Sequence, residues 1–186
     1  MRRHVGEAYT TVQEHLLNII REQDWRSASG FDYNIVFDDD AGEAADVVAI
    51  GMQEDVFRID LFHCKFLGEE EAGARVDDLY AICGQSARSV RWIGNPAKLL
   101  DHLVQRRRKR LRNHGEDRLV CGTEQVLKRF AKAIPESKVQ FRAFAVQPGL
   151  SKARIPSGEN VVDLLAAVDA YLHDAVELDF NVICSP

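Results

Sequence analysis

The apolar residues of this chain recur with two different spacings. Segments in which they repeat every three or four positions are typical of helices that bury one face. Such segments cover residues 7–23, 75–92, a stretch that begins at Pro96, 122–133 and 161–176. Runs rich in β-branched and aromatic residues, bounded by turn residues, indicate strands. They cover residues 33–37, 46–52, 56–66, 140–146 and 180–184. This order predicts an α/β domain with a mixed central sheet flanked by helices.

The end of the third predicted strand carries polar residues that do not suit a buried strand. Side chains alternate between the two faces of a strand, so His63 and Lys65 share one side. A hairpin across residues 51–55 would bring Asp46, at the head of the preceding strand, opposite this end. An acid, an imidazole and an ammonium group would then converge at one edge of the sheet. A purely structural explanation also fits, in which Lys65 pairs with Asp46 on the surface.

Composition places the chain among ordinary globular proteins. With 186 residues and 46% hydrophobic residues, we expect a single domain spanning 1–186, with a helical basic insertion around 95–133. No apolar run is long enough to cross a membrane, and the N-terminus lacks a signal-peptide core. The four cysteines are scattered without a CxxC pair, which favours free thiols and a cytoplasmic protein.

The charged residues are distributed unevenly. Residues 38–78 contain 13 acidic and three basic residues, whereas residues 88–112 contain nine basic residues and one acidic residue. The densest basic cluster lies near the end of the second stretch and consists of Arg106, Arg107, Arg108, Lys109, Arg110 and Arg112. Carboxylates hold divalent cations, and Arg and Lys hold phosphates. The pattern therefore suits nucleic-acid contact, although a solvated helix face would look the same.

The arrangement of Asp46, a hairpin and then x-Lys at Lys65 resembles the PD-(D/E)xK superfamily, which has the restriction-endonuclease-like fold. The resemblance implies an α-β-β-β-α-β core and metal-dependent hydrolysis of phosphodiester bonds in nucleic acid, DNA more than RNA. It further implies Mg²⁺, with Mn²⁺ as a possibility, bound by Asp46 and assisted by an acid on the first helix. Glu14 is the candidate for that acid, with Glu7 or Glu22 as alternatives. Gln85 matches a glutamine that related branches carry on the helix after the lysine.

One position departs from the family pattern. The acid two residues before the lysine is replaced by His63, and imidazole suits Mn²⁺ or Zn²⁺ better than Mg²⁺. His63 could be a metal ligand or a proton-transfer group, or another acid such as Asp60 or Glu43 could complete the site. The site could also be inactive and serve only to bind nucleic acid.

Two other functions fit the same residues. His63, Lys65 and Glu70 approximate the His-x-Lys motif of the phospholipase D superfamily, in which histidine attacks phosphorus without a metal and a homodimer completes the site. A chelator would abolish the nuclease activity and spare this one. The chain could instead be a non-enzymatic nucleic-acid-binding piece of a larger restriction or phage-defence system, accompanied by or fused to a helicase.

Overall fold

The computed structural model describes residues 3–5, 8–10, 16, 32–37, 44–53, 55–65, 73–74, 76–115, 117–155 and 160–186. Its strands are β1 (Arg3–Val5), β2 (Ala8–Thr10), β3 (Asp32–Phe37), β4 (Val47–Gln53), β5 (Val56–Cys64), β6 (Leu119–Cys121), β7 (Lys138–Ser151) and β8 (Asp179–Ser185). Its helices are α3 (Asp77–Arg88), α4 (Val90–Ile93), α5 (Pro96–His114), α6 (Glu124–Ala133) and α7 (Val161–Val176), with a 3-10 turn at Ile134–Glu136.

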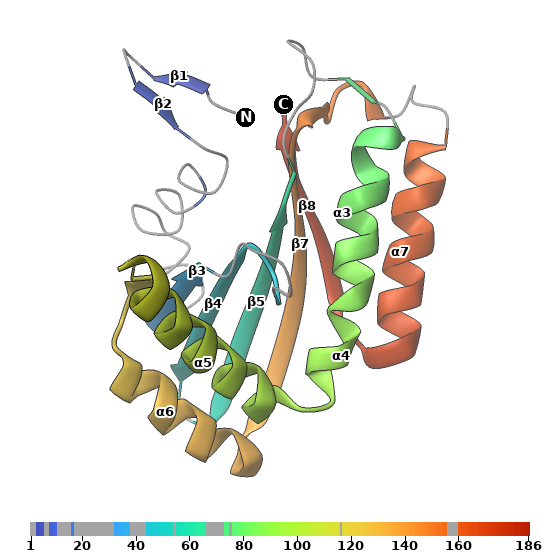
Figure 1. Ribbon diagram of the computed structural model, residues 1–186. Coiled ribbons are helices and arrows are strands. Elements are labelled where there is room, and N and C mark those ends of the chain that lie inside the picture. Colours follow the sequence, from blue (N-terminus) through green and yellow to red (C-terminus); the bar gives the residue numbers. More distant parts are fainter. Residues whose placement is uncertain are drawn as a thin grey trace.

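Six strands form one mixed sheet in the order β6-β3-β4-β5-β7-β8. Strands β6, β3, β4 and β5 are antiparallel neighbours, whereas β5, β7 and β8 run parallel to one another. Figure 1 shows α3 and α7 side by side over the β7–β8 half of the sheet, and α5 and α6 over the other half. The predicted α/β architecture, a mixed sheet flanked by helices, is confirmed.

Strand β5 lies in the middle of the sheet and is buried on both faces, which explains its nearly continuous apolar sequence. Phe57, Ile59 and Leu61 point toward the helices and join the largest core cluster. Phe62 and Cys64 point to the opposite face and pack in a second cluster. His63 therefore lies on the helix-facing side, as the alternation predicts.

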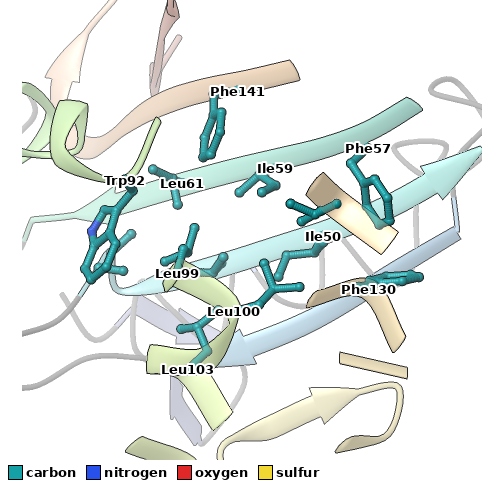
Figure 2. Packing of buried hydrophobic residues seen from close by; sticks show 14 of the residues in the cluster. Ile50, Phe57, Ile59, Leu61, Trp92, Leu99, Leu100, Leu103, Phe130 and Phe141 are labelled. Carbon is teal, nitrogen blue, oxygen red and sulfur yellow. The ribbon is translucent and has the colours of Figure 1, made fainter. Parts of the chain in front are cut away.

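The largest core cluster fixes helices α4 and α5 against the hairpin of β4 and β5 (Figure 2). Its fully buried side chains include Ile50, Phe57, Ile59, Leu61, Leu99, Leu100 and Leu103. Helix α5 begins at Pro96, where the Asn95 side chain accepts a hydrogen bond from the backbone N–H of Lys98 at 3.0 Å. It ends at Gly115, whose φ of +70° is in the left-handed region that stops a helix.

Several predicted boundaries are wrong. The helix expected over 75–92 is interrupted at Ser89, which separates α3 from α4. The strand expected to end before Pro148 continues to Ser151. The region expected to be a helical insertion also contributes β6, which pairs with the edge strand β3.

The helix predicted over residues 7–23 is wrong at its start, because Ala8–Thr10 form β2 and pair with β1. Leu16 is helical and buried. Glu7, Glu14 and Glu22 lie outside the described residues. Within the described ranges, no helix has the length and hydropathy needed to cross a membrane.

Candidate functional site

The hairpin of β4 and β5 places Asp46 beside the end of β5. The residue pair farthest from the turn of this hairpin is Val47 with Phe62. Asp46 comes directly before Val47 on one strand, and His63 comes directly after Phe62 on the other. The Asp46 side chain, 8% exposed, accepts a hydrogen bond through Oδ2 from the backbone N–H of Cys64 at 2.8 Å. The hairpin register therefore places Asp46 and His63 at the same end of the hairpin.

The direction of the backbone groups explains why this carboxylate is held there. Lys65 donates its backbone N–H to Val146 on β7 at 3.0 Å, so the preceding N–H of Cys64 points the other way, toward β4. Pairing with β4 has already ended at Val47, and a buried N–H needs an acceptor. The Asp46 carboxylate supplies it, which fixes one of its oxygens. Lys65 follows directly after the strand and is exposed.

His63 is buried, with 2% of its surface exposed, and is held by a helix. Its Nε2 lies 2.8 Å from Oγ of Ser89, which occupies the break between α3 and α4. Its Nδ1 is buried and has no hydrogen-bond partner among the described residues. Burial, and then the positive charge of Arg88, lower the pKa of His63 from 6.5 to about 4. The imidazole is therefore neutral at pH 7. Its Nε2 is hydrogen-bonded to Ser89, and its Nδ1 makes no hydrogen bond to the described part of the chain.

Gln85 lies on α3, one turn before Ser89, and is half-buried. Residues four apart share one face of a helix, so Gln85 lies on the same face as the serine that holds His63. The backbone thus brings the predicted glutamine to this side of the sheet. Ser89 itself was missed by the sequence reasoning, because only the position of the α3–α4 break identifies it.

Asp60 does not belong to this site, which corrects the idea that it could complete a metal-binding set. It is fully buried on the sheet face opposite His63. Arg142 of β7 donates to both of its oxygens, with Nε–Oδ1 and Nη2–Oδ2 distances of 2.7 and 2.5 Å. The guanidinium group also stacks over the Phe144 ring. Glu43, the other alternative acid, lies outside the described residues, as does Glu70.

The donors present decide which cation the site would fit. The described residues contain no group of three or more His, Cys, Asp or Glu side chains arranged around a metal position. The two predicted ligands at this strand end are both hydrogen-bonded already, Asp46 to the Cys64 N–H and His63 to Ser89. Mg²⁺ prefers oxygen ligands, and an imidazole nitrogen suits Mn²⁺ or a similar transition metal better.

The basic segment of α5 is partly engaged in ion pairs with its neighbours. Arg107 contacts both carboxylate oxygens of Asp117 at 2.7 Å, and it contacts Glu124 of α6 at 2.6 Å. Arg108 and Lys128 also contact Glu124, and these contacts lower the pKa of Glu124 to about 2. These arginines therefore help to attach α6 to α5.

The remaining basic residues of this segment differ in exposure. Lys109 and Arg112 are exposed, whereas Arg106 and Arg110 are half-buried. An exposed cation pays little desolvation when it meets a phosphate, so Lys109 and Arg112 are the best placed of the predicted nucleic-acid contacts. In this segment, Arg107 and Arg108 make ion pairs that link α5 to its neighbours, whereas Lys109 and Arg112 face solvent.

Comparisons of the chain with protein-family models, with curated proteins and with solved structures found no match.

Proposed function

We propose that this chain hydrolyses phosphodiester bonds in nucleic acid, at a metal-dependent site of the restriction-endonuclease-like type. The observation that carries the proposal is the juxtaposition of Asp46 with the His63–Lys65 strand end. It rests on the hairpin register and on the 2.8 Å bond from Cys64 to Asp46.

The order of elements supports the same proposal. Three antiparallel strands, β3, β4 and β5, are followed by α3 and then, after α4, α5, β6 and α6, by β7, which lies parallel to β5. The resemblance to the PD-(D/E)xK superfamily implies a β-β-β-α-β order after its first helix, which this order is compatible with if the elements between α3 and β7 are an insertion. Such a core places the start of its second strand, where the acid is expected, beside the end of its third strand, where the lysine is expected.

Each side chain has a distinct chemical role in this proposal. Lys65 is exposed and directly follows the strand, so its ammonium group can approach a phosphate oxygen and stabilise the negative charge that develops there. Asp46 and His63 would hold the cation, with His63 neutral at working pH because burial depresses its pKa. When bound, a divalent cation supplies Lewis acidity and an activated water. The exposed Lys109 and Arg112 would contact the nucleic-acid backbone, with DNA the preferred substrate over RNA.

A cleavage assay with matched variants tests this function. Plasmid and labelled oligonucleotides are incubated with the full chain in Mg²⁺, Mn²⁺ or EDTA. We expect Asp46→Asn and Lys65→Met each to lower the cleavage rate about a hundredfold, the scale of losing one electrostatic stabiliser. EDTA should abolish cleavage. Wild-type rates in both variants would overturn the proposal.

The opposite end of the sheet provides the controls. Asp55 lies in the turn between β4 and β5, and Lys138 begins β7 beside Val56, and both are exposed. Asp55→Asn and Lys138→Met make the same chemical changes away from the site. These two variants should cleave like the wild type.

A nucleic-acid-binding domain without catalysis is the second candidate, and the bonds inside the site favour it. One oxygen of Asp46 already accepts the Cys64 N–H, and the His63 ring is bonded to Ser89. Binding that weakens steeply with salt, without cleavage in any metal, would identify this function. A metal-independent mechanism with His63 as nucleophile has less support, because a ring that is 2% exposed cannot reach a phosphorus atom without rearrangement. Cleavage that persists in EDTA would favour that mechanism.

A further inference from the structure

Helices α3 and α7 carry most of the exposed large hydrophobic side chains of the described chain. Four such side chains are exposed among the described residues, and three of them lie on these two helices. Tyr80 on α3 is 62% exposed, and Val162 and Tyr171 on α7 are 50% and 51% exposed. Figure 1 shows the two helices side by side. Exposed aromatic side chains gathered in this way are typical of a surface that another protein covers.

The charges of the two helices differ, and they indicate which partner fits this surface. Helix α7 exposes Asp163, Asp169 and Asp174 and contains no lysine or arginine. Two copies of α7 packed on each other would therefore bring like charges together, which is unfavourable. Helix α3 begins with an exposed acid, Asp77, and ends with an exposed base, Arg88. Two antiparallel copies of α3 would bring unlike charges together.

One stripe of exposed residues runs along the outer side of α3. Its members are Asp77, Ala81, Gly84 and Arg88, which recur at spacings of four, three and four residues. Arg91 on α4 is also exposed and continues the stripe, because the residue between the two helices keeps helical backbone angles. Residues at these spacings form the seam between packed helices. Small residues occupy the middle of this seam, and charged residues occupy its two ends.

The stripe is self-complementary about Gly84. Tyr80 lies four residues before Gly84 and Arg88 lies four residues after it, each about 6 Å away along the helix axis. Two antiparallel copies that cross at Gly84 therefore place the Tyr80 ring of each copy against the Arg88 guanidinium group of the other, a favourable cation–π contact. Asp77 and Arg91 each lie seven residues from Gly84, so they pair in the same way. A two-fold axis makes each of these contacts twice.

Gly84 itself indicates that another molecule approaches α3 closely. A glycine inside a helix destabilises it relative to alanine, because glycine loses more conformational freedom on folding. A Cβ atom built at Gly84 would meet nothing within 4 Å, so the packing of the chain itself does not require a glycine here. At a crossing of two helices, a missing side chain lets the two backbones come close together.

We propose that α3 forms the interface of a symmetric homodimer, in which two antiparallel copies of the helix cross at Gly84 and α7 lies at the rim of the contact. This homodimer does not depend on the nuclease function. A contact centred on one pair of helices is at the small end of specific interfaces, so we expect the dimer to exchange with the monomer.

Sedimentation velocity of the full chain, from micromolar to millimolar concentration, tests the interface. The wild type should shift from monomer to dimer as the concentration rises. Gly84→Gln should remain monomeric, because its side chain occupies the crossing point. Urea unfolding of this variant, at a concentration where the wild type is monomeric, should show no loss of stability, because the space around position 84 is open.

Gly94→Gln is the matched control. Gly94 is also exposed, and a Cβ atom built there also meets nothing within 4 Å, but it lies ten residues beyond the crossing point. This variant should dimerise like the wild type. A wild type that stays monomeric at every concentration, or equal dimerisation of Gly84→Gln and wild type, would overturn the homodimer.

Charge exchange and cross-linking test the antiparallel register. Asp77→Arg should weaken the dimer about tenfold or more, because it places two arginines opposite each other, and adding Arg91→Asp should restore it. In Gly84→Cys the two new thiols meet at the two-fold axis, so mild oxidation should link the copies. Gly94→Cys should not link them, because the two copies of that position lie about 30 Å apart in this register. A dimer that Asp77→Arg does not weaken, or one that links through position 94 instead of 84, would contradict the crossing at Gly84.

Discussion

Acidification from pH 7 to pH 4 should remove about 3 kcal/mol of the free energy of unfolding through His63 alone. The unfolded chain protonates this imidazole near its ordinary pKa of 6.5, whereas burial keeps it neutral in the folded protein down to about pH 4. The difference of about 2.5 between the two pKa values corresponds to about 3 kcal/mol.

The direction of this change in stability with pH depends on which state, folded or unfolded, binds more protons. Between pH 6.5 and about 4 the unfolded chain binds more protons than the folded one, so stability falls as the pH falls through this window. Above pH 6.5 the contribution is fully present. Below about pH 4 both states are protonated, and His63 adds no further pH dependence.

Urea unfolding of wild type and His63→Gln at steps between pH 7 and pH 4 isolates this contribution. Other groups titrate in both proteins, so the difference between the two curves reports His63. We expect the wild type to be the more stable at pH 7 and its advantage to shrink by about 3 kcal/mol at pH 4. His173→Gln, a change at an exposed histidine of α7, should follow the wild-type curve. Parallel curves for wild type and His63→Gln across the window would refute the reasoning.

Three further predictions concern the ion pairs. Arg142→Ala removes the bidentate partner of the fully buried Asp60 and should cost about 3–5 kcal/mol in urea unfolding. Asp60→Ala should cost less, because the side chain of Arg142 is 24% exposed and can reach water; the reverse order would contradict this account. Glu124 has a pKa of about 2 against an ordinary 4.5, so its contribution to stability is present above pH 4.5 and is lost as the pH falls toward 2. Glu124→Gln should abolish this loss in thermal unfolding, and an unchanged acid profile would count against the network. Lys109→Ala should reduce the slope of log K for DNA binding against log salt concentration by about one, the equivalent of one phosphate contact, and should leave the Tm unchanged. Arg107→Ala should lower the Tm, because it removes the contacts with Asp117. Equal effects of these two changes on Tm would show that the division of the basic segment is wrong.

The part of the site that follows from local rules could be predicted from the sequence. Alternation along β5 and a tight turn near Asp55 are enough to place Asp46 beside His63, because hairpin register depends on neighbouring residues. The start of α5 could likewise be predicted, because proline is favoured at the first position of a helix and Pro96 occupies it.

The contacts that could not be predicted join distant parts of the chain. Asp60 and Arg142 meet across 82 positions, because β7 pairs in parallel beside β5, and no local pattern specifies that neighbour. Ser89 meets His63 because α3 ends just there and the chain turns into α4. Pro148 was taken as the end of a strand, yet β7 continues through it to Ser151, with a shift in its register against β8 at this point.

Anomalous scattering from crystals of the full chain grown with Mn²⁺ and a short oligonucleotide tests the central claim most directly. The account predicts one strong Mn²⁺ peak bound by the Asp46 carboxylate and Nδ1 of His63, with a phosphate between the ion and Lys65. A Mn²⁺ peak elsewhere, or a phosphate bound only along α5 with no ion at Asp46 and His63, would contradict it.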